Sequence, residues 1–287
     1  MTATILNSRA MSVELKVELR EDVQRYLQRH GSAPSLVIVR VEGDAASGVY
    51  SKSILRIATE IGVQARLELL SATTTPAELR SVLLALNSDT SVHGIIVQMP
   101  LPTHLLQEIV VDTIAVEKDI DGISPLSAGR LALGVSGFLP STAAAVMEIF
   151  ARSQISLEGK HVVVLGRSNV VGKPLALLCL QKSATVTICH SRTPDLLSFT
   201  RQADILIAAV GRPRMVSAEM VRAGAVVIDV GTNALPEGGI VGDVDFAALQ
   251  EIASAITPVP GGVGPLTNVL LLKQCIQAAW SQSGSSL

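Results

Sequence analysis

A tyrosine and a lysine lie two residues apart in the segment YSKSILR, which opens a helix-like stretch at residues 50–56. A phenol and an ammonium group are side chains able to hold a substrate and move a proton. In a helix each residue turns by about 100°, so Lys52 lies roughly 200° round from Tyr50. Apolar residues at 50, 54, 57, 58 and 61 share one face, and Lys52 lies on another. The pattern therefore predicts Lys52 as a solvated charge and places Ile54 on the face of Tyr50.

A second segment with chemical potential is GRSNVVGKP, at 166–174, which follows the apolar run HVVVL and opens a helical pattern. A glycine at the end of a strand and another at the start of the next helix let backbone amides face a pyrophosphate. The spacing departs from Gly-x-Gly-x-x-Gly, because Ser168 replaces the middle glycine and the loop is longer. Taken alone this is a weak signal, since a tight turn explains Gly166 and Gly172 equally well.

The end of the following apolar run favours one nucleotide over another. Sites for NAD place a carboxylate roughly 20 residues beyond the glycines, where it binds the ribose 2′-hydroxyl. Here the strand end reads ICHSRT, without an acid but with Ser191 and Arg192, and Arg167 lies in the first loop. Hydroxyl and guanidinium groups suit a 2′-phosphate, so the sequence favours NADP. A solvated loop charge is the plain alternative for either arginine.

Several function classes are excluded by composition. The chain has 287 residues, 48% of them hydrophobic and 2% aromatic, with a net charge of -2. The core must be aliphatic, and no basic stripe suggests nucleic acid. No apolar run approaches a membrane span, and the N-terminus lacks the pattern of a secretory signal. Three cysteines without a Cys-x-x-Cys pair imply neither a disulfide framework nor a metal site, and suit a reducing cytoplasm.

Aliphatic runs alternate with amphipathic stretches along most of the chain. Strands are predicted at 35–41, 65–70, 93–99, 161–166, 184–189, 203–211 and 225–231, and helices at 47–61, 76–86 and 266–282. Nearly continuous Val/Ile runs are typical of parallel strands buried on both faces. We predict a two-domain α/β protein with a parallel sheet in each domain. The Gly-rich stretch 122–140 marks the junction.

The motifs GRSNVVGKP, CHSRT, AAVGRP, VIDVGTN, GDVDF and TPVPGGVGPLT, with GIIVQMPLP and KDIDGISP, resemble those of the bifunctional methylenetetrahydrofolate dehydrogenase/methenyltetrahydrofolate cyclohydrolase family. The resemblance runs from about residue 35 to 275. It implies an α/β folate-binding catalytic domain with a parallel sheet at 1–122 and a Rossmann-type doubly wound NADP-binding domain at 140–265. It also implies a C-terminal helix at 266–282 that packs back on the first domain. It further implies a cytoplasmic homodimer acting on a folate substrate in one-carbon metabolism.

The resemblance also assigns residues to roles. Tyr50, Gln98 and Asp121 match catalytic positions, and together with Pro100, Gly264 and Pro265 they match positions that bind the folate. Matches to cofactor-binding positions are Gly166, Arg167, Ser168, Ser191 and Thr232, to which the strand-end argument adds Arg192. Plain alternatives stay open: Gln98 as the cap of a strand end, Asp119 as a turn carboxylate and Asp121 as the start of a turn.

One departure from the family pattern bears on chemistry. The family has Ser-x-x-Tyr-x-x-x-Lys, and here Ser47 and Tyr50 are kept while Ile54 occupies the position of the lysine. Hydride loss from 5,10-methylenetetrahydrofolate needs alignment more than an acid or base. Ring opening of the methenyl product needs a proton donor, which the lysine supplies in the family. We therefore expect weak or absent cyclohydrolase activity. Lesser departures are PSTA at 140–143 and Asn7-Ser8-Arg9 near the start.

Three alternatives remain at this point. The enzyme could be fully bifunctional if another group, such as a water held by Gln98, replaces the lysine. A related two-domain dehydrogenase acting on a small acid would need a proton-accepting Lys or Asp, and YSKSI offers none on the right face. A non-catalytic folate- or nucleotide-binding protein is a third possibility, which the retained Gln98, Asp121 and PVPGGVGP segment disfavour.

Overall fold

The computed structural model describes residues 2–284, apart from the side chains of residues 45 and 46. The chain divides into two compact units. The three-stranded unit comprises Val13–Ser141 and Asn268–Leu287, and the six-stranded unit comprises Met1–Ser12 and Thr142–Thr267. The predicted α/β class with parallel sheets is confirmed.

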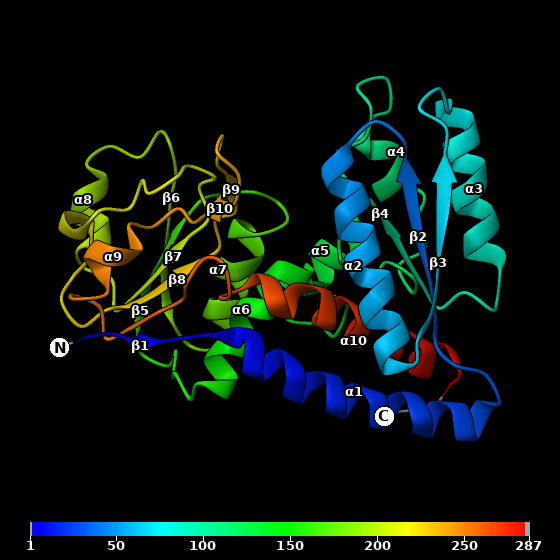
Figure 1. Ribbon diagram of the computed structural model, residues 1–287, viewed down its shortest axis with the longest axis horizontal. Coiled ribbons are helices and arrows are strands. Elements are labelled where there is room, and N and C mark those ends of the chain that lie inside the picture. The colour runs from blue at the N-terminus through cyan, green and yellow to red at the C-terminus, as the bar shows by residue number, and fades with distance from the viewer. Residues whose placement is uncertain (1, 285–287) are drawn as a thin grey trace. The chain divides into compact units, whose positions relative to one another are not determined.

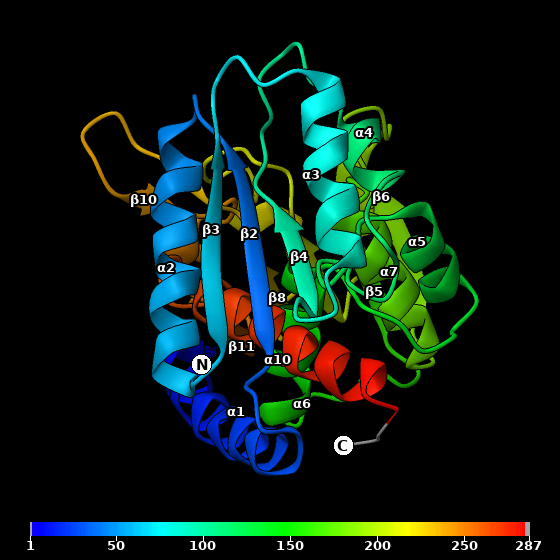
Figure 2. The same ribbon diagram turned by 90° about the vertical axis from the view of Figure 1, so that its right-hand side faces the viewer.

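The three-stranded unit is built on a parallel sheet with strand order β3-β2-β4, seen side by side in Figure 2. Its elements are β2 (Ser35–Val41), α2 (Ala45–Ile61), β3 (Gln64–Leu70), α3 (Pro76–Ser88), β4 (Gly94–Val97), α4 (Gln107–Val111) and α5 (Pro125–Ala132), with most of α1 (Ser8–His30) and α10 (Gly264–Gln282). Every residue of β4 is buried, whereas β3, at the sheet edge, is largely exposed. The rule of strands buried on both faces therefore holds for the central strand β2 and for β4 at one edge, and not for β3 at the other edge.

Helices cover both faces of this sheet. Leu79, Leu83 and Leu86 of α3 pack with Val37 and Val39 of β2 in one buried cluster. On α10, Cys275 donates to the carbonyl of Ser35 at 3.5 Å. The side-chain amide of Gln274 donates to the carbonyls of Ile120 and Leu139, each at 2.8 Å. The C-terminal helix is thus tied to this unit by specific polar contacts as well as by apolar packing.

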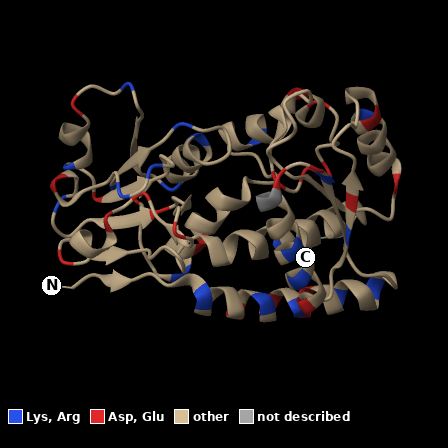
Figure 3. Ribbon diagram, turned by 45° about the horizontal axis from the view of Figure 1, so that its top comes forward, with Lys and Arg blue, Asp and Glu red and all other residues tan. Residues whose placement is uncertain are grey.

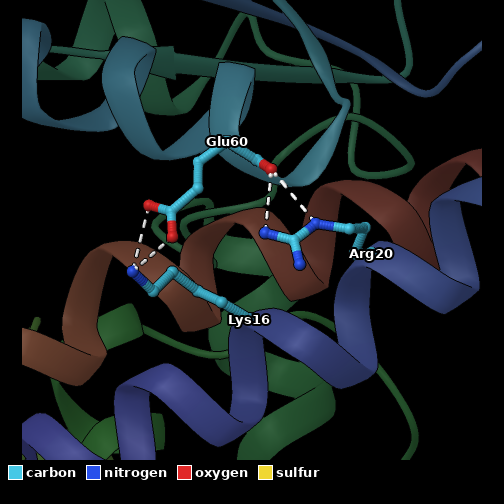
Figure 4. A network of polar contacts seen from close by, with 3 residues as sticks. All are labelled: Lys16, Arg20 and Glu60. Carbon is cyan, nitrogen blue, oxygen red and sulfur yellow. Dashed lines mark hydrogen bonds and ion pairs between the residues drawn. The ribbon is translucent and has the colours of Figure 1, made fainter.

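Helix α1 was not predicted, although it is the longest helix described. Leu15, Leu19, Val23 and Tyr26 recur at helical spacing and are at most 3% exposed, which gives the helix an apolar stripe to bury. Figure 4 shows how its polar side is held to α2: Lys16 Nζ lies 2.7 Å from the Glu60 carboxylate, and the Arg20 guanidinium donates to the Glu60 carbonyl at 3.3 Å.

The six-stranded unit carries a parallel sheet with strand order β1-β11-β8-β7-β5-β6. Five of these strands, all but β11, are labelled in Figure 1. Its strands are β1 (Thr4–Ile5), β5 (His161–Leu165), β6 (Thr185–Cys189), β7 (Ile205–Ala208), β8 (Val226–Asp229) and β11 (Ala255–Ile256). Its helices are α6 (Ser141–Arg152), α7 (Gly172–Gln181), α8 (Leu196–Thr200), the 3₁₀ helix η1 (Ala218–Met220) and α9 (Phe246–Leu249). A small antiparallel hairpin is formed by β9 (Asn233–Ala234) and β10 (Ile240–Val241). From β5 the chain continues to β6 on one side of the sheet and then crosses to β7 on the other side, so β5 lies where the direction of strand succession reverses. Open α/β sheets bind ligands at such a switch point.

The unit boundaries differ from the predicted domain limits in two places. The first residues belong to the six-stranded unit, because β1 pairs in parallel with β11 (Thr4 opposite Ala255). The stretch 122–140 belongs to the three-stranded unit and contains α5, whose cap Ser124 accepts from the amide of Ser127. Glycine is required at Gly122, where φ is +61° and a Cβ would lie 2.7 Å from the Phe138 carbonyl oxygen.

The distribution of charged and apolar residues among the described residues bears on possible membrane and metal binding. Basic and acidic segments are interspersed over the ribbon in Figure 3. None of the helices formed by the described residues is long and apolar enough to cross a bilayer. No group of three or more His, Cys, Asp or Glu side chains among them is placed to hold a metal ion.

Candidate active site

A cavity of about 500 Å³ lies at the carboxyl ends of β5, β6 and β7, at the switch point of the six-stranded sheet. Four of the predicted cofactor residues line it: Gly166, Arg167, Ser168 and Ser191. Sequence reasoning did not assign His190, Thr193 and Arg212, which line it as well. Their signal was present in the CHSRT and AAVGRP segments.

The loop after β5 is shaped by two glycines. At Gly166 φ is +124°, and a Cβ there would collide with the carbonyl oxygen of Ala209. At Gly172, the first residue of α7, a Cβ would lie 2.6 Å from the carbonyl carbon of Gly166. Ser168 Oγ accepts from the amides of Val171 at 3.1 Å and Gly172 at 3.3 Å, so this hydroxyl organises the turn in place of the missing middle glycine. The backbone can therefore approach a phosphate closely.

The loop after β6 is a tight polar turn. The amide of His190 donates to Thr193 Oγ1 at 2.9 Å, and the amide of Arg192 donates to His190 Nδ1 at 3.2 Å. Ser191 faces the cavity, whereas Arg192 is exposed beside it and is not part of the lining. The lining contains arginine and hydroxyl side chains and no carboxylate. The glycine cradle and this set of donors fit a dinucleotide that carries a 2′-phosphate.

A smaller cavity of about 240 Å³ lies in the same unit, beyond the end of β8. It brings together Thr232, predicted to bind the cofactor, with Gly264 and Pro265, predicted to bind the folate. Arg9, from the Asn7-Ser8-Arg9 segment, also lines it. The start of α1 is held against its wall by Ser8, whose hydroxyl donates to the Gly262 carbonyl.

In the three-stranded unit, Asp121 is hydrogen-bonded to Ser141, and Tyr50 lies close to both residues. Ser141 Oγ donates to Asp121 Oδ1 at 3.0 Å. Tyr50 is 37% exposed overall, yet burial of its phenol group raises its pKa well above the ordinary value, and the charge of Asp121 adds to the rise. Sequence reasoning noted PSTA only as a departure, so it missed Ser141, whose hydrogen bond to the predicted site residue Asp121 is visible only in the tertiary structure.

Asp121 is the titratable group of this cluster. Burial raises the pKa of its carboxyl to about 6, the hydrogen bond from Ser141 opposes the rise, and the charge of Asp119 reinforces it. Asp119 itself is 1% exposed and accepts from the amides of Ile123 at 3.1 Å and Ser124 at 2.9 Å. The turn-carboxylate interpretation therefore describes Asp119, while Asp121 remains a candidate for substrate binding.

Gln98 and Pro100 follow β4 in the same unit. Gln98 is 6% exposed, and its backbone amide donates to the carbonyl of Val39 at 2.8 Å, which extends the pairing of β2 and β4 past the strand end. Pro100 is exposed. The strand-cap interpretation of Gln98 thus accounts for the hydrogen bond of its backbone amide. Substrate binding by its buried side chain remains a proposal.

The helix α2 places Ile54 as the periodicity predicted. Ile54 is 0% exposed and lies in the apolar stripe with Ile57, Ala58 and Ile61, whereas Lys52 is exposed on another face. The helix starts at the cap Asp44, which accepts from the amide of Ser47 at 2.6 Å. The position in line with Tyr50 is thus held by a buried aliphatic side chain.

The fold and these sites indicate a two-unit α/β protein with a dinucleotide-binding site in one unit, while the other unit contains Tyr50, Gln98 and Asp121. Residues 6–121 match the sequence model of the tetrahydrofolate dehydrogenase/cyclohydrolase catalytic domain, and residues 140–283 match that of the family's NAD(P)-binding domain. The bifunctional protein FolD of Roseiflexus sp. (strain RS-1) is 48% identical over 285 residues, which are 99% of each chain.

Solved structures agree with the sequence comparison. The FolD methylenetetrahydrofolate dehydrogenase/cyclohydrolase of Campylobacter jejuni superposes with a TM-score of 0.95 at 42% identity, covering 96% of this chain and 98% of that one. The Trypanosoma brucei FolD, solved with NADP and an inhibitor, gives a TM-score of 0.93 at 36% identity over 99% of both chains. The chain belongs to the tetrahydrofolate dehydrogenase/cyclohydrolase family, and its cofactor is NADP.

Proposed function

We propose that this enzyme oxidises 5,10-methylenetetrahydrofolate to 5,10-methenyltetrahydrofolate and hydrolyses the methenyl product weakly or not at all. The observation that carries the second half is Ile54, fully buried in line with Tyr50, where the family motif has lysine. Family membership supports the oxidation. We propose that the extent of hydrolysis depends on the residue at position 54.

The oxidation depends on placement. NADP⁺, when bound, accepts a hydride from the carbon between two folate nitrogens, and those nitrogens share the positive charge that remains. The tasks of the chain are to hold the two reactants in contact and to keep their orientation. Tyr50, exposed enough to present its ring, is proposed to hold the folate together with Gln98 and Asp121 of the same unit.

Hydrolysis requires a group that gives a proton to a ring nitrogen as the ring opens. Ile54 has none, and the raised pKa of Tyr50 keeps its phenol protonated and a poor acid at neutral pH. One observation favours the alternative of a fully bifunctional enzyme: the pKa of Asp121 is raised to about 6, which would let this carboxyl exchange a proton near neutrality. The curated relatives, named as bifunctional, point the same way.

Parallel assays of the purified protein separate these functions. We expect saturable reduction of NADP⁺ by methylenetetrahydrofolate, and hydrolysis of methenyltetrahydrofolate little above the uncatalysed rate. A hydrolysis turnover similar to the oxidation turnover would establish the bifunctional alternative. Absence of NADP⁺ reduction would favour a non-catalytic binding protein.

We also propose that the protein is a cytoplasmic homodimer, as its resemblance to the family implies. The edge strand β3 leaves Leu67 36% exposed and Leu69 48% exposed, apolar surface that a second copy would cover. Light scattering coupled to size-exclusion chromatography tests the stoichiometry, and a single-chain mass would contradict it.

A further inference from the structure

Two buried aspartates in the six-stranded unit have no part in the function described so far. Asp229 ends β8 in the VIDVGTN segment, and Asp243 lies in the GDVDF segment. They are 2% and 0% exposed. A buried carboxylate is costly unless several donors satisfy its oxygens. The contacts of the pair therefore indicate what the carboxylates hold in place.

The Asp243 carboxylate accepts from three consecutive backbone amides of the loop that follows β7. Its Oδ2 accepts from Val210 at 2.6 Å and from Gly211 at 2.9 Å, and its Oδ1 accepts from Arg212 at 2.9 Å. Asn233 completes the set by donating its side-chain amide to Oδ1 at 2.9 Å. Val210 and Arg212 line the larger cavity, so this carboxylate fixes one wall of the nucleotide site without lining it.

Asp229 performs the corresponding task at the smaller cavity. Its Oδ1 accepts from the amides of Gly231 and Asp243, each at 2.9 Å, and its Oδ2 accepts from Val244 at 3.0 Å. Asp229 and Gly231 line the smaller cavity. The two carboxylates are thus connected in series through the backbone amide of Asp243, and they join the walls of both cavities.

The backbone beside the two carboxylates is packed so closely that it leaves no room for a side chain at two glycines. A Cβ at Gly231 would collide with the Asp243 carboxylate, and a Cβ at Gly242 would collide with the Asp229 carboxylate. Both glycines are therefore required by close approach of the backbone to the carboxylates. Loops held this tightly keep their shape when the cavities are empty, which spares a ligand the cost of ordering them.

We propose that Asp243 is a positioning residue for NADP: it holds the loop 209–212 in the conformation that binds the cofactor and keeps it in register with the Asp229–Thr232 segment. This inference rests on the cofactor of the family and is independent of the proposed loss of hydrolysis. An asparagine cannot replace the carboxylate, because it offers one acceptor oxygen where Asp243 uses two, and its amino group would face a loop amide. The loop would then populate other conformations. The apparent affinity for the cofactor would fall in proportion to the fraction of molecules that keep the binding conformation.

The test is Asp243→Asn, with direct titration of NADP⁺ by calorimetry in the absence of folate. We expect the Kd for NADP⁺ to rise about ten- to a hundredfold, the scale of a lost hydrogen bond to a charged acceptor. The matched control is Asp245→Asn in the same segment. The Asp245 side chain caps α9, where it accepts from the amide of Ala248 at 3.3 Å, and forms no hydrogen bond with the loop 209–212, so Kd should stay within about twofold of the wild-type value.

Thermal unfolding of each variant separates positioning from simple stabilisation. An Asp243→Asn protein with a lowered Tm but an unchanged Kd would overturn the proposal, and so would an equal loss of affinity in Asp245→Asn. If Asp243→Asn does not fold, Asn233→Ala removes one of the four donors and should raise Kd about threefold; an unchanged Kd would refute the proposal. Binding is measured without turnover, so the outcome does not depend on either catalytic step.

Discussion

Replacement of Ile54 by lysine is the sharpest perturbation of the proposed chemistry. Residues four apart on a helix are neighbours, so a lysine at this position would extend along the same face as Tyr50. Ile54 is 0% exposed, and the new ammonium group would be partly desolvated. Desolvation lowers the pKa of a lysine, which makes it a better proton donor near neutral pH.

Two magnitudes follow from the burial of this side chain. General acid–base assistance is worth about 100- to 10,000-fold in rate, or about 2.7–5.4 kcal/mol of activation free energy. Loss of a fully buried isoleucine costs about 1.5–3 kcal/mol of stability, part of which the lysine methylenes retain. The variant should therefore gain hydrolysis by two to four orders of magnitude and unfold at a lower temperature, with hydride transfer nearly unchanged.

The assay follows the disappearance of methenyltetrahydrofolate after subtraction of the uncatalysed rate, beside NADP⁺ reduction by methylenetetrahydrofolate. Ile54→Met is the matched control, because it has an unbranched chain of similar length without a proton to give. We expect the methionine variant to remain as poor a hydrolase as the unmodified protein.

Three results would refute the reasoning. One is efficient hydrolysis by the unmodified protein, and another is equal hydrolysis by the lysine and methionine variants. A third is a lysine variant that folds and oxidises folate normally but gains no hydrolysis, which would show that a proton donor at this position is not what the ring opening lacks.

Further predictions concern the two cavities and the cluster around Tyr50. Gly172→Ala should lower Tm and raise the Kd for NADP⁺ at least tenfold, since its Cβ meets backbone, whereas Gly129→Ala, where nothing lies within 4 Å, should be neutral or stabilise by up to about 1 kcal/mol. The raised pKa of Asp121 means that the folded state binds its proton more tightly than the unfolded state, so this contribution to stability is present below about pH 4 and is lost as pH rises through about 6. Urea unfolding at several pH values should show wild-type stability falling by about 1–3 kcal/mol relative to Asp121→Asn across that window, and parallel curves would contradict this. Ser141→Ala should raise the KM for folate and leave the Kd for NADP⁺ unchanged, because it removes the hydrogen bond that orients the Asp121 carboxylate; Ser141→Thr, which keeps a hydroxyl, is its control.

Much of the fold could be predicted because its determinants are local. Runs such as SLVIVRV are rich in β-branched residues and too short for helices, and β2 spans the predicted range. The 3.6-residue period of the stretch after Tyr50 placed Ile54 and Lys52 on their faces without coordinates. The long helix α1 was missed, although its apolar stripe is present in the sequence, and α5 was hidden by the glycines of its segment.

The sequence by itself determined the α/β class, the family and the side chain at position 54, because these depend on residue identity and short-range period. Only the tertiary structure decided that Ser141 binds Asp121, that Thr232 shares a cavity with Gly264, and that Asp243 holds a loop 31 to 33 residues distant. A hydrogen bond across such a separation depends on how strands are ordered in the sheet. That order is set by the packing of the whole unit and leaves no periodic trace in the chain.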